Sequence, residues 1–270
     1  MINIQDEYRG LLSGILYGGT EKKDRTGTGT RAVFGRMLRH NMSLGFPLLT
    51  AKKIFFNHAI TELLWILQGR TDLRFLHDHG VTYWNDDYKK SGRADGTLGA
   101  VYGKQLRYFN GADQLEYVLE QIKQNPSSRR IMASLWNPSD MDDMVLPPCH
   151  HGFQVFINDG KLSLSWTQRS ADIFLGLPYD FAIYGLLLLM LAQGNGYQPH
   201  ELVCFLGDCH LYNDHVDPAL KYLSRKDGKL PTVKLKKGLS LDTEIEIPEH
   251  NDIILTDYNP APPIKAPLST

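Results

Sequence analysis

The feature that most constrains the fold is an apolar run from Phe181 to Ala192, which contains no charged residue. A helix that crosses a bilayer needs about 20 apolar residues, so this run is too short to span a membrane. It lies within a longer segment, Phe174 to Gln193, with Pro178 near the expected first turn, and predicts a buried helix. A helix that is apolar all round must be covered on more than one side, which requires a large core.

Length and composition allow such a core in one piece. The chain has 270 residues, and 42% of them are hydrophobic. No Ser/Gly/Pro-rich stretch, charge run or internal repeat divides the sequence. We therefore expect a single domain over residues 1–270.

Charge and cysteine content exclude several function classes. The formal net charge is −1, so the chain lacks the basic field of a DNA-binding protein. Three cysteines make no disulfide framework, and an odd number fits a reducing compartment. The segment Met1–Glu7 has no basic start followed by an apolar stretch, so we expect no signal peptide. These observations predict a cytoplasmic protein that binds neither DNA nor membranes.

Hydrophobic periodicity and turn residues predict the other elements. We expect helices at Asp6–Tyr17, Phe55–Gln68 and Leu115–Gln124. We expect strands within Arg31–Thr50, Ile131–Trp136, Phe153–Ile157, Leu162–Trp166 and Leu202–Leu206, with a hairpin turn at Asp159-Gly160. We expect an exposed loop at Lys89–Gly96 and place His210 and Tyr212 just beyond the strand that ends at Leu206. From there to about Tyr258 we expect short strands and loops.

The segment Leu146–Asp180 carries most of the reactive groups. It offers a thiol, an imidazole, a guanidinium, a hydroxyl and two carboxylates among apolar residues, so we expect a partly buried pocket. Cys149 lies between Pro148 and His150. A lone cysteine is often an inert core thiol, whereas a nearby cation lowers the pKa of a thiol and makes it nucleophilic.

Three further features place charged groups where they need a partner. The glycine- and threonine-rich segment 24–30 is either a polar turn or a loop that binds an anion with help from Arg25. Glu62 lies in an apolar helix, where a carboxylate must be paired, hydrated or functional in proton transfer. Arg129 and Arg130 are adjacent, so on a strand they point to opposite faces. Both side chains can reach one ligand only if the chain turns or bulges there, or if they contribute to a site in a neighbouring subunit.

Several motifs together resemble the thymidylate synthase family over nearly the whole chain. They are segment 24–30, Glu62–Trp65, Val101–Gln105, Ser128–Arg130, Pro147–His150, Gln168–Asp172, His210–Tyr212 and Ile264–Pro267. The resemblance implies a single α/β (α+β) domain with a large mixed sheet flanked by helices. It also implies a homodimer formed by packing of sheet against sheet. The tail Ile264–Thr270 is then either a frayed end or a flap that closes on the site.

The resemblance implies one-carbon transfer from 5,10-methylenetetrahydrofolate to C5 of a pyrimidine deoxynucleotide, with no metal. Addition of the Cys149 thiolate at C6 would make C5 nucleophilic. The family's catalytic residues match Cys149, Glu62, Tyr102, His150 and Asp172, and its folate contacts match Lys52, Trp84, Leu146, Asp172 and Gly176. The nucleotide contacts match Arg25, Arg129, Arg130, Arg169 and Ser170 for the phosphate, with Arg129 and Arg130 supplied by the partner subunit, and His210 and Tyr212 for the sugar 3′-hydroxyl.

One departure from the family concerns the base. The family carries an asparagine where this chain has Asp180, after Leu177-Pro178-Tyr179. An amide complements uracil, whereas a carboxyl group can accept from the 4-amino group of cytosine and share a proton with N3. Asp180 therefore predicts dCMP as the substrate in preference to dUMP. The alternative is neutral drift at a helix start, where Asp is common.

A second departure concerns the product. Bacterial members commonly have two tryptophans in the row that reads Trp84-Asn85-Asp86-Asp87 here. A carboxylate at Asp87 predicts a wetter site, in which water attacks the exocyclic carbon and the product is 5-hydroxymethyl-dCMP. This is similar to the deoxycytidylate hydroxymethylases of bacteriophages, which act in the host cytoplasm. A methyltransferase that acts on dCMP or dUMP remains open, because Trp84 and the tail are retained. So does a non-catalytic homologue that binds nucleotide or RNA.

Overall fold

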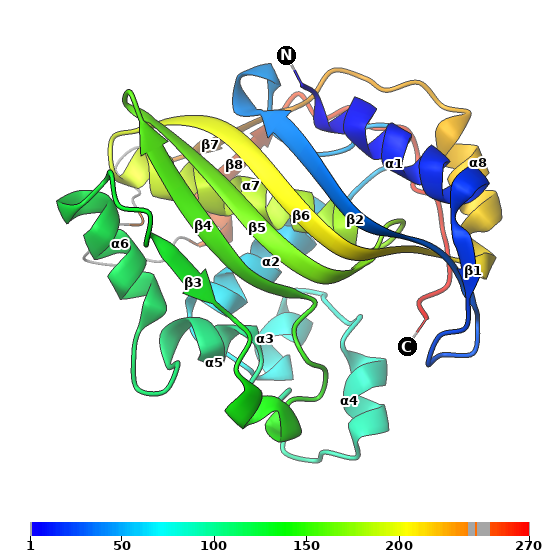
Figure 1. Cartoon of the computed structure of the whole chain (residues 1–270), viewed down its shortest axis with the longest axis horizontal. Coiled ribbons are helices and arrows are strands. Elements are labelled where there is room, and N and C mark those ends of the chain that lie inside the picture. The colour runs from blue at the N-terminus through cyan, green and yellow to red at the C-terminus, as the bar shows by residue number, and fades with distance from the viewer. Residues whose placement is uncertain (1, 237–240, 242–248, 270) are drawn as a thin grey trace.

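The computed structural model describes residues 2–236, 241 and 249–269, and is built on a six-stranded mixed sheet in the order β1-β2-β6-β5-β4-β3 (Figure 1). All neighbouring strands are antiparallel except β5 and β6, which are parallel. The strands are β1 (Thr20–Lys22), β2 (Thr30–Asn41), β3 (Met132–Ser134), β4 (His150–Asn158), β5 (Lys161–Asp172) and β6 (Gln198–Tyr212). A second, two-stranded sheet pairs β7 (Thr232–Leu235) with β8 (Ile253–Thr256).

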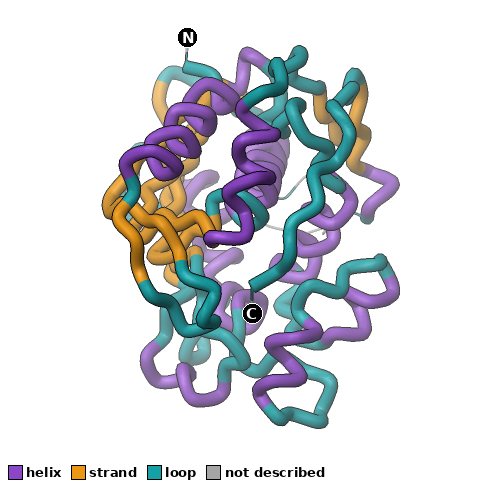
Figure 2. The backbone as a smooth tube through the Cα atoms, turned by 90° about the vertical axis from the view of Figure 1, so that its right-hand side faces the viewer, coloured by secondary structure: helices purple, strands orange, loops and turns teal. Residues whose placement is uncertain are grey.

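Helices cover one face of the large sheet. Helix α7 (Leu177–Gly194) packs on β5 and β6, and α2 (Phe56–Leu67) packs on α7 behind it (Figures 1 and 2). Helix α1 (Ile4–Gly18) lies against β2 and contacts α8 (Val216–Leu223). The smaller helices are α3 (Leu73–Asp78), α4 (Asn85–Ser91), α5 (Tyr102–Arg107) and α6 (Gln114–Gln124).

The predicted buried helix is confirmed as α7. Every residue from Phe181 to Ala192 is buried, and α7 connects the parallel strands β5 and β6 through the core. It is long and apolar enough to cross a membrane, but 83% of that window is buried inside the protein, as expected of a core helix. It begins at Leu177 rather than Phe174 because residues 173–176 form a turn, in which Asp172 Oδ1 accepts from the N–H groups of Phe174 and Leu175.

The hairpin and the three predicted helices are confirmed, with ends shifted by one or two residues. Asp159 (φ 49°) and Gly160 (φ 71°) both have positive φ, as a tight two-residue hairpin turn requires. Strand β5 continues beyond the predicted Trp166 to Asp172, and β6 continues beyond Leu206 to Tyr212, because the two strands pair over this length. His210 and Tyr212 are therefore in a strand and not beyond it.

Other expectations need correction. The loop predicted at Lys89–Gly96 begins inside α4, which is polar on its exposed side and ends at Gly92 in the left-handed conformation. Helix α8 was not predicted, because it is short. The expectation of short strands and loops for residues 237–240 and 242–248 lies outside the described residues. Up to Ser269 the tail is packed rather than frayed: Ile264 is buried, and the Pro267 carbonyl lies 2.7 Å from His215 Nε2.

Candidate active site

The chain topology brings the reactive residues to one end of the sheet. β5 and β6 are parallel and end at Asp172 and Tyr212, while the antiparallel β4 begins just after Cys149. Asp172 lies opposite His210 in this register, and Tyr212 lies opposite Thr30 at the start of β2. Segment 24–30 leads into β2 at this end of the sheet, and α7 begins here soon after β5 ends. Residues distant in sequence therefore surround one site.

Arg169 shapes the segment that carries Cys149. Its Nε donates to the Pro148 carbonyl and its Nη2 to the Pro147 carbonyl, each at 2.9 Å. The backbone N–H of Arg169 also donates to the Cys149 carbonyl at 2.8 Å. The guanidinium therefore both orders the Pro-Pro-Cys segment and holds a positive charge beside it.

Cys149 is a partly buried thiol in a field of opposing charges. Burial raises its pKa, and the Asp180 and Asp87 carboxylates add to this effect. Arg169 and Arg25 lower the pKa of Cys149, as expected of nearby cations. Their effect is smaller than that of burial, so the pKa remains raised. The thiol is therefore the stable form in the free protein. The backbone N–H of Cys149 donates to Tyr102 Oη at 2.8 Å, which fixes Tyr102 against the nucleophile.

Asp180 lies in the first turn of α7 and is only 8% exposed. Its Oδ2 accepts from Gln168 Nε2 at 2.9 Å, and its Oδ1 is 4.0 Å from His150 Nε2. Burial raises the pKa of Asp180 to about 7, with smaller contributions from the Glu62 and Asp172 charges, against the lowering effect of the Gln168 bond. Asp180 is therefore a carboxyl group that can hold a proton at neutral pH.

His150 is a buried and neutral imidazole. Its ring stacks on Tyr102 at 4.4 Å, and its Nδ1 lies 2.7 Å from the Tyr184 hydroxyl. Burial lowers its pKa to about 3. The 4.0 Å approach to Asp180 is therefore not an ion pair at neutral pH.

Glu62 is paired, as the sequence required. The Tyr83 hydroxyl donates to its Oε2 at 2.5 Å, and Trp84 Nε1 donates to its Oε1 at 3.2 Å. Burial raises the pKa of Glu62 in spite of these two bonds. Trp84 also packs edge-on against Tyr102, which links Glu62 to the Cys149 side of the site.

The segment 24–30 is an ordered loop that presents Arg25 at the mouth of the site. Asp24 accepts from the backbone N–H groups of Thr26 and Gly29, at 2.9 and 2.7 Å. The Arg25 side chain is 61% exposed, and its Nη2 lies 3.7 Å from Asp87 Oδ1. Burial raises the pKa of Asp87. The negative charge of Asp87 in turn raises the pKa of Cys149. Asp87 thus borders the site, although α4 is distant in sequence from Cys149.

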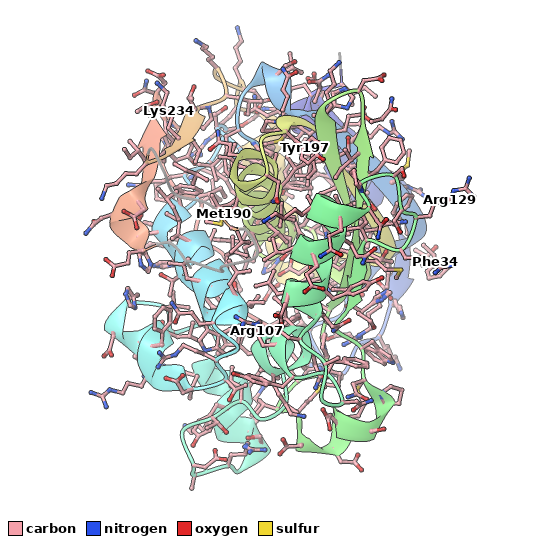
Figure 3. All side chains as sticks on the ribbon, turned by 90° about the vertical axis from the view of Figure 1, so that its left-hand side faces the viewer. Phe34, Arg107, Arg129, Met190, Tyr197 and Lys234 are labelled. Carbon is pink, nitrogen blue, oxygen red and sulfur yellow. The ribbon has the colours of Figure 1, made fainter. Side chains whose placement is uncertain are left out.

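The remaining expected contacts fall into two groups. His210 and Tyr212 lie edge to face at 5.2 Å beside Asp172, and Ser170 is half-buried on β5. Arg129 and Arg130 are exposed before β3 and do not join these residues within the chain. Figure 3 shows Arg129 pointing outward on the same side as Phe34.

The expected folate contacts differ in exposure. Leu146 is half-buried, and Gly176 has so little room that an added Cβ would lie 3.3 Å from the Asp172 carbonyl oxygen. Lys52 is only 4% exposed, although two adjacent lysines in a sequence are usually both solvated. Its ammonium bonds the Phe174 carbonyl and lies 3.9 Å from the centre of the Phe174 ring. Burial lowers the pKa of Lys52 to about 7.

Four residues of the site received no role from the sequence: Tyr83, Trp166, Gln168 and Tyr184. Tyr83, Gln168 and Tyr184 are the hydrogen-bond partners of Glu62, Asp180 and His150 in turn. Trp166 bonds Gln168 and stacks on Tyr184. The sequence could have indicated that Trp166 and Gln168 lie on the same face of the sheet, because alternate residues of a strand share a face. Within the described part of the chain, no three His, Cys, Asp or Glu residues form a group that could hold a metal ion.

Comparison with known families agrees with this geometry. The profile of the family described as thymidylate synthase matches residues 6–270. The match includes the Cys149 segment, the arginines and the residues at the ends of β5 and β6. The chain therefore belongs to the thymidylate synthase family, whose members are enzymes that transfer a one-carbon group from methylenetetrahydrofolate to C5 of a pyrimidine nucleotide.

Proposed function

We propose that this enzyme is a dCMP hydroxymethyltransferase that converts dCMP to 5-hydroxymethyl-dCMP. The observation that carries the proposal is Asp180, a buried carboxyl group with a pKa of about 7 at the position where the family has an asparagine. Cys149 adds to C6 of the ring and makes C5 electron-rich, which allows C5 to bond the transferred carbon. Arg169 and Arg25 favour the thiolate, and the phosphate clamp positions the ring for attack.

Asp180 chooses the base through its two oxygens. One oxygen accepts from the 4-amino group of cytosine, and the protonated oxygen donates to N3. Uracil presents the opposite pattern, an N3–H donor and an O4 acceptor. Unpaired polar groups in a buried site can discriminate by roughly 10⁴-fold, so a carboxyl group whose proton is on the oxygen that faces N3 supports a strong preference.

Asp87 supports hydroxymethylation over methylation. It borders the site, is half-buried and carries a raised pKa, so it keeps a polar wall where an aromatic side chain would exclude water. Loss of the C5 proton expels tetrahydrofolate and leaves an exocyclic methylene group on C5. Water adds to that carbon, Cys149 leaves C6, and the folate is released without oxidation. Glu62, Tyr102 and His150 would move protons near the ring. Asp172 is near enough to Asp180 for its charge to raise the pKa of that carboxyl group.

The folate site and the sugar site follow the family pattern. Trp84, Leu146, Gly176 and Lys52 form the folate contacts, and methylenetetrahydrofolate supplies the one-carbon unit. His210 and Tyr212 bind the sugar 3′-hydroxyl from the end of β6. Lys52 reaches the folate's glutamate tail only if its ammonium leaves the Phe174 carbonyl. The reaction takes place in the cytoplasm.

The phosphate clamp requires two copies of the chain. Arg25, Arg169 and Ser170 lie at the site, whereas Arg129 and Arg130 are exposed elsewhere and serve the site of the partner. The helix-free face of the sheet carries exposed apolar side chains that a sheet-to-sheet dimer would cover: Phe34, Met37, Met132, Phe156 and Phe205.

Competition between the two nucleotides tests the base assignment. The enzyme and its Asp180→Asn variant are assayed for turnover of dCMP and dUMP. We expect the wild type to prefer dCMP and the variant to prefer dUMP, because an amide restores the complement of uracil. A wild type that prefers dUMP rejects the assignment.

Methylation is the second candidate, favoured by the buried Trp84 and the packed tail. Both features keep water from the folate side of the site. The absorbance of dihydrofolate distinguishes the two products, since only methylation oxidises the folate. One dihydrofolate formed for each nucleotide converted excludes hydroxymethylation.

A further inference from the structure

A chain of three side chains on β5 and α7 leads from the core to the base-reading carboxyl group. Trp166 Nε1 donates to Gln168 Oε1 at 3.1 Å. Gln168 Nε2 in turn donates to Asp180 Oδ2 at 2.9 Å and to the Ser170 carbonyl at 3.0 Å. Trp166 and Gln168 are both buried, so water does not compete for these bonds.

The indole and the Ser170 carbonyl together decide which end of the Gln168 amide faces Asp180, and the indole is the group that binds the amide oxygen. An amide can present either its oxygen or its NH₂ group, and the two orientations have nearly the same shape. The indole N–H of Trp166 is a donor only, so it binds the amide oxygen and directs the NH₂ group toward Asp180. The Ser170 carbonyl, an acceptor only, requires the same orientation.

We propose that Trp166 is a positioning residue for base recognition, which acts through Gln168 to make Asp180 Oδ2 an acceptor and leave Oδ1 to carry the proton. The inference rests on the proposed role of Asp180 in binding cytosine. A donor already occupies Oδ2, so the proton of the neutral carboxyl group belongs on the other oxygen. That oxygen donates to N3 of the base, while Oδ2 has a second lone pair for the 4-amino group.

A reversed amide would undo this arrangement. The Gln168 oxygen would then face Asp180 and draw the carboxyl proton onto Oδ2, away from the base. Cytosine would lose its donor to N3, and the free oxygen would accept from N3–H of uracil instead. The loss of the indole N–H should therefore lower the preference for dCMP more than it lowers overall turnover.

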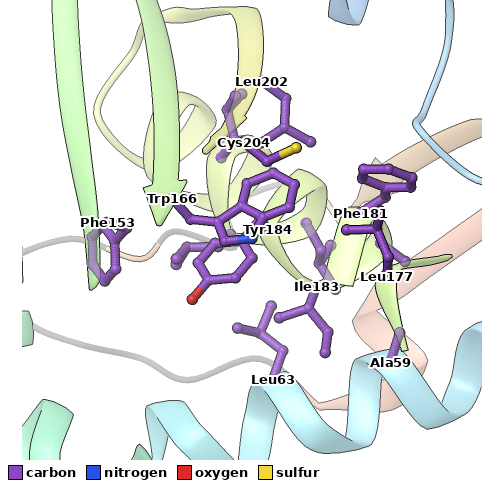
Figure 4. Packing of buried hydrophobic residues seen from close by; sticks show 14 of the residues in the cluster. Ala59, Leu63, Phe153, Trp166, Leu177, Phe181, Ile183, Tyr184, Leu202 and Cys204 are labelled. Carbon is purple, nitrogen blue, oxygen red and sulfur yellow. The ribbon is translucent and has the colours of Figure 1, made fainter. Parts of the chain in front are cut away.

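Trp166 also packs in the core, and the test must separate packing from hydrogen bonding. Its indole lies next to the Tyr184 ring (Figure 4) and stacks on it, with ring centres 4.7 Å apart and an interplanar angle of 6°. It also lies edge-on to Phe181. Trp166→Phe keeps an aromatic ring and removes the N–H. Trp65→Phe is the matched control, because Trp65 is equally buried and its N–H bonds the Asp72 carbonyl, away from Asp180.

The primary readout is the ratio of kcat/KM for dCMP to that for dUMP. We expect Trp166→Phe to lower this ratio about tenfold, the worth of one buried hydrogen bond, and Trp65→Phe to leave it unchanged. In a Gln168→Met background, Trp166→Phe should have no further effect on the ratio, since Trp166 acts only through Gln168. An unchanged ratio in folded Trp166→Phe, or an equal fall in Trp65→Phe, overturns the inference.

A second readout needs no nucleotide and separates this inference from the proposed function. The carboxyl pKa of Asp180 is measured by infrared titration, with Asp180→Asn as the blank. The surrounding titratable groups are retained in Trp166→Phe: Glu62, Asp172, Cys149, His150 and the tyrosines 83, 102 and 184. We expect an upward shift of about one pKa unit, because the donor that favours the carboxylate is lost.

The two readouts assign each failure to its cause. A wild type that prefers dUMP, together with a raised Asp180 pKa in Trp166→Phe, overturns the proposed function and keeps the orienting role of Trp166. A wild type that prefers dCMP, together with an unshifted pKa, overturns the orienting role alone. If Trp166→Phe does not fold, Gln168→Met carries the test, and an unshifted Asp180 pKa there overturns the inference.

Discussion

At the scale of single residues, the site depends on titratable groups whose neutral forms are favoured by burial. Asp180 can hold a proton near neutral pH, His150 lacks one, and burial raises the pKa of the Cys149 thiol. Each state follows from desolvation, with neighbouring charges as smaller corrections. In the proposed reaction, the base preference and the reactivity of the nucleophile therefore depend on how deeply three side chains are buried.

This arrangement predicts how substrate preference depends on pH. The pKa of Asp180 is raised to about 7, so the carboxyl group is protonated below that pH and ionised above it. Ionisation removes the donor to N3, so the dCMP-to-dUMP ratio of kcat/KM should fall as pH rises through about 7. Cys149 ionisation is common to both substrates and cancels in the ratio. Asp180→Asn should have a ratio independent of pH, and a flat wild-type ratio would reject the role of the proton.

The sequence identified Asp180 but not its supports. A carboxylate where the family has an amide is visible from the motif alone. The orientation of Gln168 by Trp166 depends on two side chains meeting in the core, which no local pattern encodes. The burial of Lys52 against Phe174, far along the chain, is likewise not encoded in any local pattern.

At the scale of elements, strand ends and helix starts carry the chemistry. β5, α7 and β6 form a parallel crossover unit, which places Asp172, Asp180 and Tyr212 at one end of the sheet. Helix α4 completes this end with Asp87, and segment 24–30 faces it through Arg25. The longest periodic elements were predictable from sequence. Helices α4 and α8 were missed because short elements give weak periodicity.

The position of Asp87 predicts the fate of the transferred carbon. Asp87→Trp should replace the polar wall by an apolar one and raise the yield of dihydrofolate for each nucleotide converted. Asp86→Trp is the matched control, since Asp86 is exposed on the same helix. The yield is measured by dihydrofolate absorbance against nucleotide consumed. Asp87→Trp also removes the exposed ion pair between Asp87 and Arg25. Loss of this pair should cost less than about 1 kcal/mol. An unchanged yield in Asp87→Trp would show that this residue does not control water.

Helix α7 supplies a stability prediction. Leu188 is fully buried in α7, whereas Leu220 on α8 is 42% exposed. Leu188→Ala should lower the free energy of unfolding by about 3 kcal/mol, because it removes buried surface and leaves a cavity. Leu220→Ala should change it by less than about 1 kcal/mol. Urea unfolding measures both, and equal effects would contradict the central position of α7.

At the scale of the whole molecule, helices cover one face of the sheet, and the described residues place no helix on the other face. Exposed apolar residues on the second face and the remote Arg129 and Arg130 both point to a second copy of the chain (Figure 3). The sequence suggested this through the doubled arginine. Which face would be covered could not be read from sequence, because strand pairing decides which residues share it.

Shared sites predict complementation between inactive variants. Cys149→Ser lacks the nucleophile, and the double variant Arg129→Ala/Arg130→Ala lacks the partner's clamp. After subunit exchange, mixed dimers should contain one complete site, and activity should recover to about a quarter of the wild-type value. Each variant alone, refolded in the same way, serves as the control. No recovery would contradict the proposal that Arg129 and Arg130 cross the interface.

The central claim is that Cys149 activates a cytosine ring that Asp180 has selected. The most direct test is mass analysis of the nucleotides after incubation of equimolar dCMP and dUMP with methylenetetrahydrofolate. The account predicts that dCMP gains the mass of one formaldehyde unit while dUMP is unchanged. A product formed from dUMP, or a dCMP product that is heavier by only a methylene unit, would contradict it.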